Sequence, residues 1–62
     1  MLPGVDIARL RCEVIIIAMV GEANADWWWN SDNKAFELRT PNQQWILDWQ
    51  IVHTYLMGHA GR

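Results

Sequence analysis

The residues of this chain that could carry chemistry are one cysteine, Cys12, and two histidines, His53 and His59. Only Cys12 and His53 could be imagined as a nucleophile and its base, and no orienting group stands out beside them. The two histidines are six positions apart and Cys12 is distant from both, and this set of spacings matches no common zinc motif. On a helix Cys12 would lie beside an apolar run, which favours an inert packing thiol. We therefore expect no catalytic residue, no metal site and no cofactor, and a protein that is not an enzyme.

The outstanding feature of the composition is its tryptophan content, with five among 62 residues. Tryptophan and tyrosine are the side chains most enriched where protein partners are held tightly. The sequence therefore predicts a protein-binding function. The residues that we expect to contact the partner are Ile16, Val20, Trp27, Trp49, Tyr55, Met57, His59 and Arg62.

Length and charge exclude several other classes. The net charge of −2, from five basic and seven acidic residues, excludes a polybasic nucleic-acid module. The longest apolar run covers residues 14–20, whereas a membrane-spanning helix needs about 20 residues. Asp6 and Glu13 lie where a secretory leader would be basic, which disfavours a leader despite the cleavage-like spacing of Ala23 and Ala25. A lone cysteine fits a reducing compartment, so we expect a cytoplasmic protein.

A chain of this size forms one domain, which we place at residues 1–62. Such a domain buries only about 60% of the surface that its unfolded chain exposes, so its core is marginal. A single cysteine allows no internal disulfide to reinforce it. We therefore expect a homo-oligomer or an obligate complex with a protein partner.

The first helix is predicted over about residues 5–20, ending at Gly21. A strand is less favourable, since no second strand is evident to pair with it. Its core-facing stripe has 3-4-3-4 spacing and consists of Ile7, Leu10, Val14, Ile17 and Gly21. Arg9 and Glu13 form an i,i+4 pair on the other side, and that side continues into Ile16 and Val20. Either the end of the helix is wrapped on all sides, or these two apolar residues contact another chain.

A short second helix is predicted over residues 22–29. Its three consecutive tryptophans cannot all face one core, because neighbouring helical positions point about 100° apart. At least one must lie at an edge or an interface. Residues 30–34 are rich in turn formers, and Phe36 is the expected anchor of the connector that follows.

Thr40 and Pro41 predict the start of the last helix, as N-cap and first helical residue. Gln43 completes a capping box with Thr40, and the helix is expected to break near Asp48. Its apolar stripe consists of Trp45, Trp49, Val52 and Leu56, and residues 58–62 are expected to be a loose tail. The fold class is therefore all-α, a small bundle of three to four helices.

The stretch of residues 25–41 also carries a motif. Trp28, Trp29, Asn33, Phe36 and Pro41 match, in order, the Trp, Leu, Asn, Leu and Pro of a pattern that ends in Thr-Pro. That pattern resembles the C-terminal toxin-binding domain of Xre/MbcA/ParS antitoxins. The chain departs from it in two ways: Asp32 replaces a proline, and no glycine lies between Phe36 and Pro41.

The resemblance implies a stand-alone toxin-binding domain whose partner is an NAD-consuming toxin of the RES or ADP-ribosyltransferase-like type. The block would be steric, with the tail at residues 58–62 closing the toxin's active site. The family's helix-turn-helix region has no counterpart in these residues, so DNA binding is not expected. Two alternatives remain: a phage- or plasmid-encoded inhibitor of another host or defence protein, and a homodimerising structural module.

Overall fold

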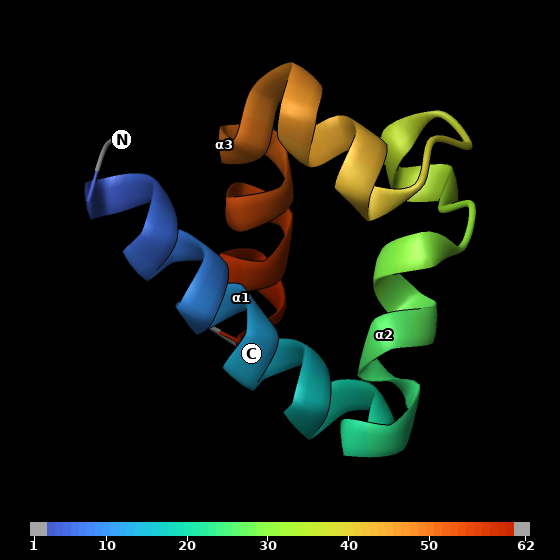
Figure 1. Cartoon of the computed structure of the whole chain (residues 1–62). Helices are drawn as coiled ribbons and strands as arrows, with labels where there is room; N and C mark the ends of the chain where they lie inside the picture. Colours follow the sequence, from blue (N-terminus) through green and yellow to red (C-terminus); the bar gives the residue numbers. More distant parts are fainter. Residues whose placement is uncertain (1–2, 61–62) are drawn as a thin grey trace.

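The computed structural model describes residues 3–60, which form a small bundle of helices (Figure 1). The elements are α1 (Pro3–Val20), α2 (Glu22–Asn30), the short 3-10 helix η1 (Lys34–Phe36) and α3 (Pro41–Ala60). No strand occurs among these residues. The predicted all-α fold class is confirmed.

Glycine separates the first two helices, as predicted. Gly21 has a φ of 91°, a left-handed value that glycine adopts without steric cost. Its amide still donates to the carbonyl of Ile17 at 2.9 Å, and its carbonyl already accepts from Asn24 at 3.1 Å. One residue therefore closes α1 and opens α2, so the second helix leaves at a sharp angle.

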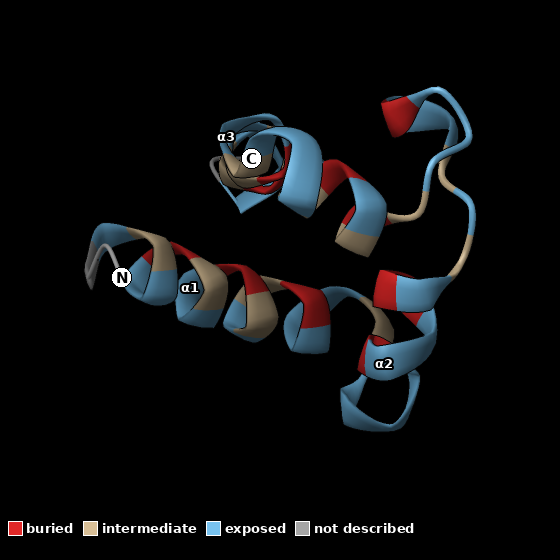
Figure 2. Ribbon diagram, turned by 45° about the horizontal axis from the view of Figure 1, so that its top comes forward, coloured by how far each residue is buried: buried red, intermediate tan, exposed pale blue. Residues whose placement is uncertain are grey.

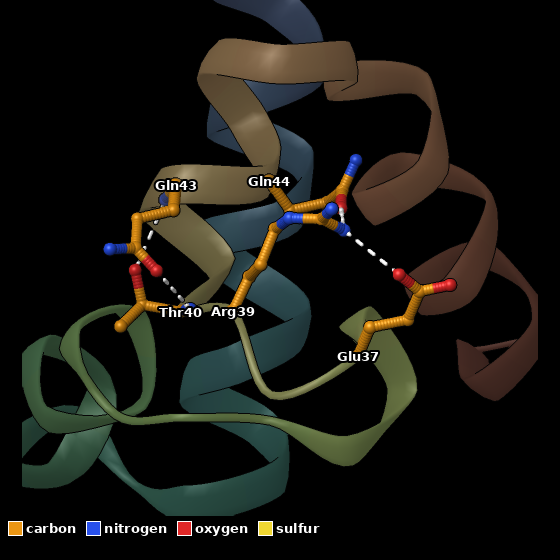
Figure 3. Close-up of polar contacts among 5 residues, drawn as sticks. All are labelled: Glu37, Arg39, Thr40, Gln43 and Gln44. Carbon is orange, nitrogen blue, oxygen red and sulfur yellow. Dashed lines mark hydrogen bonds and ion pairs between the residues drawn. The ribbon is translucent and has the colours of Figure 1, made fainter.

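The capping box at the start of α3 is confirmed (Figure 3). The backbone N–H of Gln43 donates to the Thr40 hydroxyl oxygen at 3.1 Å. The backbone N–H of Thr40 donates to the Gln43 side-chain oxygen at 2.9 Å. The pair satisfies two backbone donors that the first turn of a helix leaves free. The start of α3 at Pro41 is therefore decided locally.

The predicted break at Asp48 is also confirmed. Asp48 has φ −160° and ψ 96°, which is extended rather than helical backbone. Its carboxylate accepts from the Gln50 amide at 3.1 Å and so caps a new helical segment. Figure 1 shows α3 turning sharply at this point. The chain thereby gains two segments that can face different neighbours.

The core gathers side chains from all four elements: Cys12, Ile16, Ala25, Trp28, Trp29, Phe36, Val52 and Leu56. Aromatic rings meet edge to face within it. The Trp28 and Trp29 centroids are 5.3 Å apart, and Phe36 lies 5.3 Å from Tyr55. Such edge contacts favour aromatic pairs beyond their burial. Phe36 is therefore the anchor that was predicted.

The predicted orientation of α1 is wrong. Ile16, expected on the exposed side, is 0% exposed, while Leu10 and Val14, expected in the core, are 68% and 67% exposed. Ile7 and Ile17 are exposed with them, and Val20 is half-buried against the core. Figure 2 shows the buried positions of α1 along the side that faces α3, with exposed positions opposite. The helix is thus rotated relative to the sequence-based expectation.

The reason lies in the neighbours of a buried indole. Trp29 is buried, and its ring N–H donates to the Glu13 carboxylate at 2.7 Å. The guanidinium carbon of Arg9 lies 3.5 Å from the centre of the Trp29 ring, and Arg9 also donates to Asn42 at 2.8 Å. Arg9 and Glu13, predicted to pair with each other on the surface, both turn towards Trp29 instead. A buried indole N–H needs an acceptor, so the side of α1 next to these two residues turns inwards.

The end of α3 differs from the predicted tail. The helix continues through Gly58 to Ala60, and the Nδ1 atom of His59 lies 3.0 Å from the Tyr55 carbonyl oxygen. The expected loose segment therefore does not begin at Gly58. Residues 61 and 62 of that tail, including the predicted contact Arg62, lie outside the described residues.

Candidate functional site

The predicted partner contacts do not form one surface. Ile16 is buried and cannot contact a partner. Trp27 is the exposed member of the three consecutive tryptophans, as the helical geometry required, but it lies on α2. Val20 lies on α1 and is half-buried. The other described candidates lie on α3, where Trp49, Tyr55 and Met57 are half-buried and His59 is exposed. Among them only Tyr55 and His59 are paired, with ring centroids 4.4 Å apart.

Cys12 and His53 do not resemble a catalytic pair. Cys12 is a free, fully buried thiol, and burial raises its pKa, although the charge of Arg9 opposes the rise. A raised pKa disfavours the thiolate that nucleophilic chemistry requires. The ring of His53 packs edge-on against Trp49, with centroids 5.9 Å apart. Cys12 therefore belongs to the packing of α1, as the sequence indicated.

Two further properties of residues 3–60 bear on the kind of site that the chain offers. No group of three or more His, Cys, Asp or Glu side chains is placed there to hold a metal ion. None of the helices in this part of the chain combines the length and the apolar character that a bilayer-crossing segment requires.

The hollow surface of the described chain follows the bend of α3. One open depression is lined by Arg39, Gln43, Ile46 and Leu47. The next shares Arg39 and Leu47 with it and extends to Ile51, and a third continues from Ile51 to Tyr55. We call this set of neighbouring depressions, from Ile46 through Leu47 and Ile51 to Tyr55 with Arg39 on its edge, the kink groove. It spans the bend of α3 at Asp48.

An unusual loop supplies one wall. Glu37 and Leu38 both have positive φ, 56° and 67°, which side chains other than glycine adopt at a cost of roughly 1–2 kcal/mol each. The backbone of Asn33 holds the loop in this shape. Its carbonyl oxygen accepts from the Leu38 N–H at 3.0 Å, and its N–H donates to the Arg39 carbonyl oxygen at 3.1 Å. The result is a large apolar side chain, Leu38, held in an exposed position next to Arg39.

Arg39 is the cationic group of this surface. Figure 3 shows its side chain between Glu37 and Gln44. Its Nη1 atom lies 3.4 Å from the Glu37 carboxylate and 3.4 Å from the Gln44 side-chain oxygen. Both contacts are long and the ion pair is largely exposed, so it contributes little to folding. The guanidinium can therefore exchange these contacts for a carboxylate of a partner.

A second apolar surface lies on α1. It consists of the exposed residues Ile7, Leu10, Val14 and Ile17, which we call the outer stripe. These residues were expected in the core, and Leu38, Ile46 and Leu47 were not among the expected partner contacts. One signal could have found the last two. They follow Trp45, and three consecutive apolar residues on a helix cannot share one face.

Comparisons of the chain with protein-family models, with curated proteins and with solved structures find no match.

Proposed function

We propose that the chain is a non-catalytic protein-binding module that holds its partner in the kink groove. The observation that carries this proposal is the run of adjoining apolar depressions along the bend of α3. Ile46 at its end is 85% exposed, and Leu47 is exposed beside it. Large apolar side chains in one hollow, with a single guanidinium at the edge, have the composition of a protein contact with a polar rim.

Backbone strain occurs in the loop that supplies Glu37 and Arg39 to this surface. Strained residues persist where the surrounding structure holds them, and they concentrate at functional positions. Here two consecutive strained residues hold Leu38 out in solvent, where burial by a partner would be favourable. A fold that needed only a tight turn would be better served by glycine.

The resemblance to the antitoxin domain supplies the candidate partner, an NAD-consuming toxin that the module would cover and block. Two observations favour the resemblance. The matched residues Trp28, Phe36 and Pro41 are all buried. The two residues with positive φ also fall in the spacer where the antitoxin pattern carries its glycine. Because α3 remains helical to Ala60, we assign the contact that blocks the toxin to the kink groove. A flexible tail that begins at Gly58 and enters the active site is no longer part of the proposal.

Co-expression with the proteins encoded beside this chain tests the proposal. We expect a complex to co-purify and, for a toxin partner, NAD consumption to stop at equimolar chain. Ile46→Lys and Leu47→Lys should lose the complex. Met19→Lys is the matched control, because it places the same charge on an exposed apolar position of α1. A complex of normal affinity with either groove variant would contradict the proposed site. A complex that forms with a protein unrelated to NAD chemistry would retain the site and reject the toxin.

Leu38 offers a sharper test. Leu38→Gly should raise the free energy of unfolding by about 0.5–1 kcal/mol and yet weaken the complex, since it removes strain and contact together. Glu37→Gly is the matched control, because it should stabilise the chain by the same mechanism and leave binding unchanged. Denaturant unfolding and titration with the co-purified partner measure the two effects. Equal binding by both variants would show that Leu38 makes no contact.

A further inference from the structure

The outer stripe of α1 remains uncovered when the kink groove is assigned to a partner. Its residues fall at 3-4-3 spacing, which is the a and d pattern of a heptad repeat. Ile7 and Val14 take the a positions, and Leu10 and Ile17 take the d positions. A helix that is apolar on two opposite sides is normally covered on both. The bundle covers only the side that carries Ala8, Cys12 and Ile16.

We propose that the outer stripe pairs with the same stripe of a second copy of this chain, as a parallel two-fold pair of α1 helices. Ile7 and Val14 at the a positions with Leu10 at the first d position support this arrangement, because β-branched residues at a with leucine at d favour two parallel strands. Ile17 at the second d position departs from this pattern. Figure 2 shows the exposed side of α1 directed away from α3, so the core need not open for the helices to pair.

Charge complementarity selects both the second copy and the direction. In this register Asp6 takes a g position and Arg11 takes an e position. A parallel pair places the g residue of one helix against the next e residue of the other, so Asp6 faces Arg11 of the second copy, twice by symmetry. Both side chains are exposed, and neither has an ion-pair partner within residues 3–60.

The antiparallel arrangement brings like charges together. With the same a and d layers, it would set Arg11 against Arg11 of the second copy. Like charges placed opposite each other disfavour a pairing. The chain's own charge pattern therefore favours the parallel dimer.

The dimer should be weak. Two helices of 18 residues joined by one stripe form an interface below the about 1,200 Å² at which stable complexes begin. We expect a dissociation constant in the micromolar range. The surface lies on α1 and the kink groove on α3, so the dimer and the proposed function can fail independently.

Sedimentation equilibrium of the full chain at micromolar to millimolar concentration tests the dimer. The parent chain should approach twice the monomer mass, while Leu10→Lys and Val14→Lys should stay monomeric with unchanged helical circular dichroism. Ile46→Lys, which adds the same charge to the kink groove, should dimerise as the parent does. A parent chain that stays monomeric throughout, or a stripe variant that dimerises normally, would overturn the proposal.

Two further variants test the direction of the helices. Asp6→Arg should weaken the dimer roughly fivefold or more, since it replaces two exposed attractive pairs by repulsive ones. Adding Arg11→Asp to it should restore the dimer. A single Leu10→Cys should form a disulfide-linked dimer under mild oxidation, because like d positions face each other only in the parallel pair. The native Cys12 is buried and does not compete. A dimer that ignores the charge exchange or does not cross-link would overturn the parallel arrangement.

Discussion

Both sides of α1 carry apolar residues at helical spacing, but one side is buried and the other is exposed. The inner side presents Ala8, Cys12 and Ile16 at spacing of four, and all three are buried. The outer stripe presents larger residues at heptad spacing and is exposed. If apolar bulk alone chose the core face, the outer stripe would be inside. The difference shows that periodicity identifies faces that need cover but does not say which neighbour provides it.

Small side chains and the polar groups beside them both favour burial of the inner side. The small side chains of Ala8 and Cys12 allow the other helices to approach α1 closely, since helix packing distance follows the residues at the contact. The same side brings Arg9 and Glu13 to Trp29, where Arg9 stacks on the ring and the Glu13 carboxylate accepts the ring N–H. Turning the outer stripe inwards would leave this indole donor without its acceptor, at a cost of about 1–3 kcal/mol.

The largest expected effect removes an aromatic ring that lies between α2 and α3. Phe36 is buried and meets both Trp28 and Tyr55 edge to face. Phe36→Ala should cost about 3–5 kcal/mol, comparable with the whole stability of a small domain. We expect loss of the cooperative thermal transition by circular dichroism. A variant that melts like the parent would show that η1 does not anchor the core.

A neighbouring pair of isoleucines tests the two sides of α1 directly. Ile16→Ala should lower the free energy of unfolding by about 2–5 kcal/mol, because it leaves a cavity in the core. Ile17→Ala removes the same atoms from a side chain that is 37% exposed and should cost clearly less at dilutions where the chain is monomeric. Urea unfolding measures both. Equal losses would mean that both sides are buried in solution.

The hydrogen bond between Glu13 and Trp29 should contribute less to the free energy of unfolding than the apolar core does. Glu13→Ala leaves the Trp29 N–H buried without its acceptor, and we expect a loss of about 1–3 kcal/mol. Arg11→Ala is the matched control, since Arg11 is an exposed charged residue on the same helix, and it should be nearly neutral. Tryptophan fluorescence during urea unfolding follows the indole environment itself. If Glu13→Ala were neutral, the 2.7 Å contact would not determine the orientation of α1.

The smallest effect at neutral pH concerns the thiol of the inner side. Burial raises the pKa of Cys12, so the folded chain keeps a proton that the unfolded chain loses above the ordinary thiol pKa of about 8.5. Stability from this group is therefore complete below that pH and falls as the pH rises beyond it. We expect the urea midpoint of the parent chain to decline between about pH 8 and pH 10. The urea midpoint of the Cys12→Ala variant should decline less over the same range.

An exposed thiol provides the contrast. Leu10→Cys in the Cys12→Ala background places the thiol on the outer stripe, where it should react with a disulfide reagent at the rate of a free cysteine. Cys12 of the parent should react far more slowly at the same pH, because it is buried and protonated. Similar rates would show that the inner side opens readily.

Local signals predicted a large part of the fold. The end of α1 at Gly21, the capping box of Thr40 and Gln43, and the break at Asp48 all depend on contacts within four residues along the chain. The exposure of at least one of the three consecutive tryptophans follows from helical geometry, and the exposed one is Trp27. These features could be predicted because the residues that decide them are adjacent, whatever the rest of the chain does.

Tertiary structure alone decided which side of α1 is buried and where the hollow surface lies. The contact between Trp29 and Glu13 joins residues 16 positions apart, and that between Arg9 and Asn42 joins residues 33 apart. No periodic pattern in one helix contains this information. The orientation of α1 depends on the free-energy cost of every unpaired buried polar group and every packing gap. These groups and gaps are defined only once the helices pack together.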